Sequence, residues 1–293
     1  MRCLKSIPIT EDIQVIVVDD NSPDADTYRE RYPELSRPYL EFIRITKSSG
    51  AGYARNVGID HAKGKWLLFA DADDFYVEDM YEIIKTYAKS KADIVYYKPQ
   101  SVYSDDIYQK SNKSEYLNKY INIFSETGDD RYVRYRWCPP WSKMLKKEFI
   151  NNFCIRFDEI QYANDYYFSV CSGIYAKNIK VVEKILYVYV DRKESLTADF
   201  CNKHGELATR ADVSFRVEKL FKQYGIHINQ HRPFIWYLKK MLKDDKRLFC
   251  FYFKRLHEIY SLKLTDILSF YNDRSFGFKL FLFFYALFVW TKR

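Results

Sequence analysis

The chain has 293 residues, of which 47% are hydrophobic and 29% charged, and this composition excludes a disordered protein. Aromatic residues make up 18%, which also argues against disorder, and a chain of this length can bury a sizeable core as one large domain or one domain plus an appendage. The net charge of +8 is uneven, because residues 201–293 hold 18 Lys and Arg against 8 Asp and Glu, whereas residues 1–200 hold 29 against 31. The basic last third suits an anionic surface, either a membrane leaflet or a nucleic acid, or is a solvated face.

Strands and helices alternate along the first 99 residues. The β-branched run "IQVIVVDD" at Ile13–Asp20 predicts a strand that is buried on both faces of a parallel sheet. The elements expected after it are a strand at Leu40–Ile45, a helix at Gly52–Gly64, a strand at Lys65–Asp71, a helix at Val77–Lys91 and a strand at Ala92–Pro99. This alternation predicts right-handed crossovers and a mostly parallel sheet flanked by helices.

The start of the chain and the residues after Pro99 do not follow this alternation. Before Ile13 there is room for about two helical turns, so the first strand of a βαβ unit and most of its helix are expected to be missing. Residues 101–130 predict a loop and helix insertion, and from about Gln230 onward the pattern predicts helices. No signal peptide is predicted, because residues 1–9 contain no long apolar run.

The last residues are strongly apolar. Phe276 to Trp290 is apolar except for Gly277 and Lys279, and at 15 residues it is shorter than the roughly 20 that span a bilayer. With basic residues inside and after it, the stretch is either an interfacial membrane anchor or a last helix packed on the core. The six cysteines are scattered without a C-x-x-C pair, which predicts reduced thiols in a cytosolic protein.

Acidic residues follow two of the predicted strands, at Asp19–Asp20 and in the segment Asp71–Asp74. In open α/β sheets, ligands bind beyond the carboxyl ends of the strands. Asp71 and Asp73 stand one residue apart and can converge on a hard cation such as Mg²⁺ or Mn²⁺, which prefers oxygen ligands and is often shared with substrate phosphates. A D-x-D pair alone is more often a strand-end turn or a helix cap.

Three segments occur together in a distinctive order: "VIVVDDNSPD", then "GAGYARN", then "GKWLLFADADD". This set resembles the inverting nucleotide-sugar glycosyltransferases of family 2, which have the GT-A fold. The later segments "CPPWSKMLKKEFI", "IRFDEIQYANDYYFS" and "YVYVDRKESLT" resemble segments of the capsule-type members, so the resemblance covers about residues 3–197.

The resemblance implies that four residues bind the donor and its cation. Asp20 would hold a uracil ring through its N3–H, and Arg55 would contact the base or the diphosphate. Asp71 would hold the ribose, and Asp73 would ligate the Mn²⁺ or Mg²⁺ that bridges the two phosphates. Such a cation stabilises the negative charge that develops on a leaving diphosphate.

On the acceptor side, the resemblance implies that Asp165 is the general base that deprotonates the acceptor hydroxyl. Trp141 either stacks on an acceptor sugar or lies in the core, and Arg192 either contacts the acceptor or a phosphate or has no role in the site. The family has Glu where this chain has Asn164, so the pKa of Asp165 is expected to be raised less. Val133 replaces the Gln of processive synthases, which favours transfer of one sugar per encounter.

These observations predict an α/β protein with the GT-A fold at residues 1–200, incomplete at its N-terminus, and a helical, basic and aromatic extension at residues 201–293. The expected activity is inverting transfer of one sugar from a nucleotide-diphospho-sugar, with UDP favoured, to a saccharide or lipid-linked saccharide in bacterial surface polysaccharide biosynthesis. The expected location is the cytoplasm, with the extension on the inner face of the cytoplasmic membrane.

Two other interpretations stay open. The chain could be a truncated, non-catalytic remnant of a transferase, because its first strand is expected to be missing. It could instead be a basic nucleic-acid-binding protein, although no segment resembles a base-reading or base-stacking motif, so no nucleic acid is expected as a partner.

Overall fold

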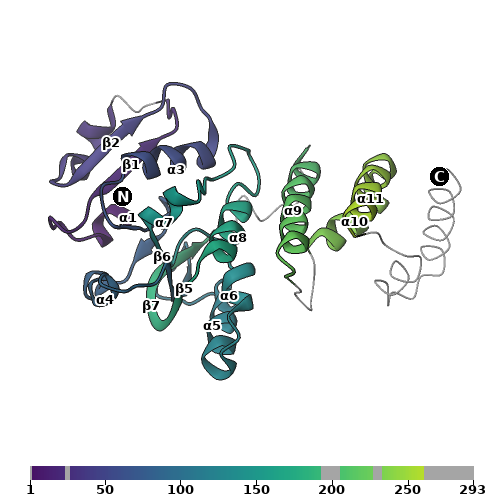
Figure 1. Cartoon of the computed structure of the whole chain (residues 1–293). Coiled ribbons are helices and arrows are strands. Elements are labelled where there is room, and N and C mark those ends of the chain that lie inside the picture. The colour runs from purple at the N-terminus through teal and green to yellow at the C-terminus, as the bar shows by residue number, and fades with distance from the viewer. Residues whose placement is uncertain (1, 24–26, 193–204, 227–232, 261–293) are drawn as a thin grey trace, which may run out of the picture. The chain divides into compact units, whose positions relative to one another are not determined.

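The computed structural model describes residues 2–23, 27–192, 205–226 and 233–260 (Figure 1). The chain divides into two compact units, residues 1–213 and residues 214–293. The domain boundary predicted at residue 200 and the apolar stretch Phe276–Trp290 both lie outside the described residues.

The first two strands form a small parallel sheet. Strand β1 (Val15–Asp19) pairs with β2 (Leu40–Arg44) in a register that starts at Val15 opposite Leu40. Helix α1 (Arg2–Ser6), helix α2 (Tyr28–Arg31) and the 3₁₀ helix η2 (Pro33–Ser36) lie around it. Among the described strands, β1 pairs with β2 alone, and its three central residues are half-buried, so it is less covered than the sequence predicted.

A second sheet has five strands in the order β3–β6–β5–β7–β4. Strands β5 and β7 run parallel, and the other three pairs are antiparallel. Parallel pairing therefore holds for β1–β2 and β5–β7 but not throughout this sheet, because an apolar run shows that a strand is buried and not which way its neighbour runs. The bounds are β3 (Trp66–Leu67), β4 (Phe75–Tyr76), β5 (Ile94–Tyr103), β6 (Lys143–Lys146) and β7 (Ile179–Asp191).

Helices of the first unit pack on both sheets (Figure 1). Helix α3 contacts β1, α5 contacts β5 and β7, and α6 contacts α8. The core between them is rich in aromatic side chains, and Trp137, Tyr97 and Phe168 are among the most deeply buried. The helices are α3 (Gly50–His61), α4 (Met80–Tyr87), α5 (Glu115–Thr127), α6 (Arg131–Tyr135), α7 (Lys147–Asn152) and α8 (Tyr166–Tyr175).

The helices predicted beyond about residue 230 are present as α10 (Pro233–Asp244) and α11 (Lys246–Tyr260), which pack against each other. Helix α9 (Glu206–Gln223) precedes them and crosses the boundary between the two units. Within the described ranges, none of the helices has the length and apolar character that crossing a membrane requires.

The cysteines in the described part of the chain are free thiols, as their scattered spacing predicted. Burial, together with the nearby carboxylates, raises the pKa of Cys3 to about 11. Burial and the charge of Asp165 raise the pKa of Cys138 to about 12. Both thiols are therefore protonated near neutral pH and are poor nucleophiles.

Gly52 lets the first turn of α3 approach the segment before α8. A Cβ atom at this position would lie 1.9 Å from the backbone oxygen of Asp158. We expect Gly52→Ala to lower the free energy of unfolding by about 1–3 kcal/mol, because one of the two backbones must move. Urea titration of both proteins measures this difference.

Gly58 on the same helix is the matched control. A Cβ atom there meets nothing closer than a methyl carbon of Val18 at 4.0 Å. Gly58→Ala should therefore stabilise the protein by up to about 1 kcal/mol, since Ala favours a helix over Gly. Equal effects of the two substitutions would show that the close approach at Gly52 is unimportant.

Candidate active site

Asp20 lies at the N-terminus of α3, where its carboxylate accepts three hydrogen bonds. The backbone N–H groups of Ser49 and Gly50 each donate to it over 2.8 Å, and the Ser48 hydroxyl donates over 3.1 Å. Burial disfavours the charge, but these donors outweigh it and hold the pKa of Asp20 below its ordinary value. A carboxylate offers about four acceptor positions, so one position is left for a further donor such as a ring N–H.

Arg55, on the next turn of α3, connects two other parts of the site. Its Nη2 donates to Oδ1 of Asp71 over 2.7 Å, and its Nη1 donates to the side-chain oxygen of Asn164 over 2.9 Å. The guanidinium also lies 5.4 Å from the centre of the Phe157 ring. Arg55 thereby joins the acidic turn after β3 to the segment that leads into α8.

The acidic turn is held by strand β7 through the buried carboxylate of Asp74. The Tyr187 hydroxyl donates to it over 2.8 Å, and the backbone N–H of Val190 donates over 2.8 Å. The same hydroxyl accepts the backbone N–H of Asp71 over 2.9 Å. Burial raises the pKa of Asp74 to about 7, with the charges of Asp71 and Asp73 adding to the effect. Asp74 therefore shapes the turn and does not face a ligand.

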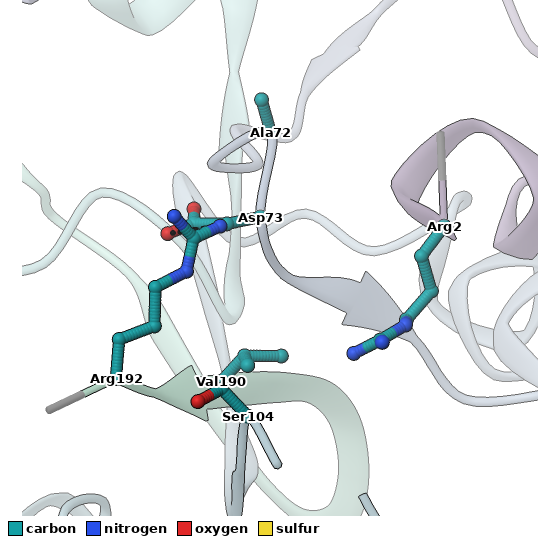
Figure 2. Close-up of a pocket in the computed structure, with 6 residues that line it drawn as sticks. All are labelled: Arg2, Ala72, Asp73, Ser104, Val190 and Arg192. Atoms are coloured by element: carbon teal, nitrogen blue, oxygen red, sulfur yellow. Dashed lines mark ion pairs between the residues drawn. The ribbon is translucent and has the colours of Figure 1, made fainter.

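Asp73 faces a cavity of about 360 Å³ whose lining is shown in Figure 2. Its Oδ2 lies 3.2 Å from Nη2 of Arg192, which directly follows β7. The sequence left open whether Arg192 contacts the acceptor or a phosphate or has no role in the site, and it gave no sign of this pairing with the predicted metal ligand. The residues around the cavity are Arg2, Ala72, Asp73, Ser104, Val190 and Arg192.

The donor set at the acidic turn fits a cation that is shared with a substrate. No group of three His, Cys, Asp or Glu side chains within the described residues could hold a metal ion alone. Mg²⁺ and Mn²⁺ are, however, commonly bound by one or two carboxylates together with phosphate oxygens. Asp73 faces the cavity and Asp71 lies two residues away on the same turn, so these two can supply such oxygens.

Asp165, the predicted base, directly precedes α8 and is half-buried. Burial raises the pKa of its carboxyl group, and the charge of Asp71 adds to this. The positive charges of Arg55 and Lys143 act in the opposite direction. A carboxylate with a raised pKa in a partly enclosed position is suited to accept a proton from a hydroxyl group.

Lys143 is a buried lysine whose charge acts on Asp165, and the sequence analysis did not identify it. Its side chain is 1% exposed, and its Nζ donates to the Ser169 hydroxyl over 3.1 Å. That hydroxyl in turn donates to the backbone oxygen of Cys138 over 2.6 Å. Burial lowers the pKa of Lys143 to about 7, although the neighbouring acidic groups oppose this. A lysine inside the apolar segment "WSKML" was the signal available in the sequence.

Trp141 lies in the core, next to β7. It is 7% exposed, and its ring stacks on the rings of Tyr187 and Tyr189 with centroids 5.1 and 5.7 Å apart. Of the two alternatives left open for Trp141, this packing favours the core residue.

The chain is similar to known proteins over most of its length. The family model described as "Glycosyl transferase family 2" matches residues 2–152. The uncharacterized glycosyltransferase EpsJ of Bacillus subtilis (strain 168) is 27% identical over 241 residues, which are 77% of this chain and 66% of EpsJ. The succinoglycan biosynthesis protein ExoO of Rhizobium meliloti (strain 1021) is 37% identical over 62 residues, which are 21% of this chain and 17% of ExoO. The chain spans less than two thirds of the length of either relative.

A solved structure has the same fold. Residues 1–349 of TarS from S. aureus, in complex with UDP-GlcNAc, match with a TM-score of 0.57 and 19% sequence identity. The match covers 92% of this chain and 70% of the TarS chain. Together with the family model, it confirms the GT-A fold that the ordered motifs predicted.

The Tyr187 hydroxyl connects two parts of the acidic turn, and its removal should loosen that turn. Tyr187→Phe keeps the stacked ring but removes the bonds to Asp71 and Asp74. We expect a loss of about 1–3 kcal/mol, because buried polar groups lose their partner. Differential scanning calorimetry would record it as a lower Tm.

Tyr189→Phe is the matched control in the same strand. Its ring also stacks on Trp141, and among the described residues its hydroxyl group makes no hydrogen bond. We expect a change within about 0.5 kcal/mol. If both substitutions lowered Tm equally, the hydroxyl of Tyr187 would not be what holds the turn.

Proposed function

Because the chain belongs to glycosyl transferase family 2, we propose that it transfers one sugar from a UDP-sugar to a saccharide acceptor with inversion at the anomeric carbon. The bridge made by Arg55 is the observation that carries this proposal. It brings the donor-side carboxylate of Asp71 and the segment of the candidate base Asp165 to one place. A single displacement needs the bound donor and the base to face the same anomeric carbon.

The proposed donor site extends from Asp20 to the acidic turn. Asp20 accepts the N3–H of uracil at its remaining acceptor position, Asp71 binds the ribose, and Arg55 carries positive charge toward the nucleotide. TarS, whose fold is similar, was crystallised with UDP-GlcNAc, which supports a UDP-sugar as the donor. A divalent cation held by Asp73 and the diphosphate would stabilise the charge on the leaving group.

In the proposed reaction, Asp165 takes the proton of an acceptor hydroxyl group. The oxygen then attacks the anomeric carbon from the face opposite the diphosphate. A new bond forms between that carbon and the acceptor oxygen, and the bond to the β-phosphate oxygen breaks, so its electron pair leaves with UDP. The proton stays on Asp165, and the configuration at the carbon is inverted in one step.

The acceptor is proposed to be a saccharide of a surface polysaccharide, free or attached to a lipid at the inner face of the cytoplasmic membrane. The name of the relative ExoO, a succinoglycan biosynthesis protein, supports a role in polysaccharide synthesis. The basic composition of residues 201–293 and the apolar stretch near the C-terminus support contact with a membrane surface. In this proposal, residues 1–200 carry the reaction and residues 201–293 the membrane contact.

Asp165→Asn should abolish transfer and keep UDP binding. Asn has nearly the same shape but cannot take up the proton, so we expect the rate of UDP release to fall about 10²–10⁴-fold. The assay measures UDP released from a panel of UDP-sugars with Mn²⁺ and saccharide acceptors, and calorimetry measures UDP binding. The exposed Glu126 on α5 supplies the control Glu126→Gln, which should leave both the rate of transfer and the binding of UDP unchanged.

The pH profile gives a second readout for the same residue. A base must be deprotonated, so transfer should fall as the pH drops through the pKa of Asp165, which burial raises above its ordinary 3.8. Arg55, Lys143 and Asp71 are the charged groups that act on it. Transfer that persists in Asp165→Asn, with an unchanged acid limb, would rule this residue out as the base.

Removal of residues 277–293 tests the membrane contact. If this apolar and basic stretch binds the bilayer surface, its loss should release the protein from vesicles that contain anionic lipid. Cosedimentation of the full and shortened chains with phosphatidylglycerol vesicles measures this, with neutral vesicles as the control. Equal binding of the two chains would contradict the proposed role of the tail.

A further inference from the structure

The cavity beside the acidic turn contains an ion pair within the protein itself. Figure 2 shows the guanidinium of Arg192 lying against the carboxylate of Asp73, and the atoms Nη2 and Oδ2 are 3.2 Å apart. Arg2 points into the same cavity from α1. The cavity is therefore lined by two guanidinium groups and one carboxylate, whose formal charges sum to +1.

The three carboxylates of the turn are compensated in three different ways. Asp74 is buried and accepts hydrogen bonds from β7. Asp71 pairs with Arg55 over 2.7 Å, and the two side chains are 34% and 19% exposed. Asp73 pairs with Arg192, and here the side chains are 34% and 51% exposed. Asp73 is therefore the carboxylate whose counter-charge is held least firmly.

An ion pair that water reaches from one side contributes little free energy. Exposed pairs are typically worth less than a factor of about five in an equilibrium constant, because water screens the charges and the long side chains lose freedom. A small dication with a preference for oxygen ligands can therefore compete with the guanidinium for Asp73. The long side chain of Arg192 can then turn within the cavity.

We propose that Arg192 is the counter-cation of Asp73 in the free protein and that a divalent cation displaces it. The displacement frees its guanidinium for the phosphate contact that the family resemblance gave as one alternative. The inference rests on the function proposed above. The planar guanidinium group matches the oxygens of a phosphate and forms strong charge-assisted hydrogen bonds with them. Once the cation neutralises Asp73, the positive charges of Arg192 and Arg2 favour an anion in the cavity.

The first measurement is a titration with Mn²⁺ in the absence of nucleotide. Electron paramagnetic resonance reports the concentration of the free ion and so gives the affinity. In Arg192→Gln, Asp73 has lost its internal competitor, so we expect Mn²⁺ to bind about two- to fivefold more tightly than in the natural chain. In the background Asp73→Asn, the substitution at 192 should have no effect on Mn²⁺, because the shared ligand is gone.

The second measurement is the affinity for UDP at saturating Mn²⁺, by calorimetry. Arg192→Gln should bind UDP about tenfold more weakly, because a charged hydrogen bond to the diphosphate is lost. Arg192→Lys should lie between the two, since Lys keeps the charge but not the paired donors. The same substitution thus strengthens the binding of Mn²⁺ and weakens the binding of UDP. Replacing a purely structural residue would not change the two affinities in opposite directions.

Arg156→Gln is the matched control. Arg156 also forms an exposed ion pair, with Asp60 over 3.1 Å, and should change neither affinity. If Asp73→Asn weakens Mn²⁺ binding but Arg192→Gln changes nothing, or changes both affinities in the same direction, the role of Arg192 is overturned while the proposed function stands. If Asp73→Asn leaves Mn²⁺ binding unaltered both without and with UDP, the metal assignment and this inference both fall. If Mn²⁺ binds only when UDP is present, this inference falls and the metal assignment stands.

Discussion

The buried carboxylate of Asp74 is the contact on which the acidic turn depends. It is 1% exposed, and its two hydrogen-bond donors, the Tyr187 hydroxyl and the Val190 N–H, both belong to β7. A cluster of like charges repels itself, so its shape must be set from outside the cluster. Since β7 supplies the donors, the position of the strand decides where the turn lies. Arg192 follows Val190 by two residues, which carries it to the same region.

Helix α3 has a comparable role on the other side of the site. Asp20 holds its N-terminus, and Asn56 exchanges two hydrogen bonds with the backbone of Phe157, over 2.8 and 3.0 Å. Arg55 projects between these two anchors to Asp71. The helix is thus fixed at its start and in its middle, and the guanidinium group lies where the acidic turn and the segment before α8 meet. A site assembled on rigid elements is positioned more precisely than one assembled on loops.

Asp20, Asp71 and Asp165 were expected in the site because the motifs around them, taken in order, resemble those of family 2 glycosyltransferases. Asp20 directly follows β1, Asp71 lies four residues after β3 and Asp165 directly precedes α8, so each stands in a short local motif. The Tyr187 hydroxyl could not be found in this way, because Asp74 and Asp71 lie 113 and 116 residues before it. Strand direction was missed for a similar reason, since the antiparallel pairing of β6 with β5 depends on how the chain returns after the helices between them.

The internal ion pairs explain how a turn with three carboxylates can fold before any ligand arrives. With Asp71 paired to Arg55 and Asp73 paired to Arg192, repulsion within the turn is already relieved. The guanidinium group of Arg192 must also weaken the binding of any cation to Asp73, because both compete for the same oxygens. In the mechanism proposed above, a diphosphate would remove this competition by offering Arg192 another partner. Cation and nucleotide would then each strengthen the binding of the other, since coupling between two ligands is reciprocal. In this proposal, the chain would hold its metal while a diphosphate is bound and would release it when the diphosphate leaves.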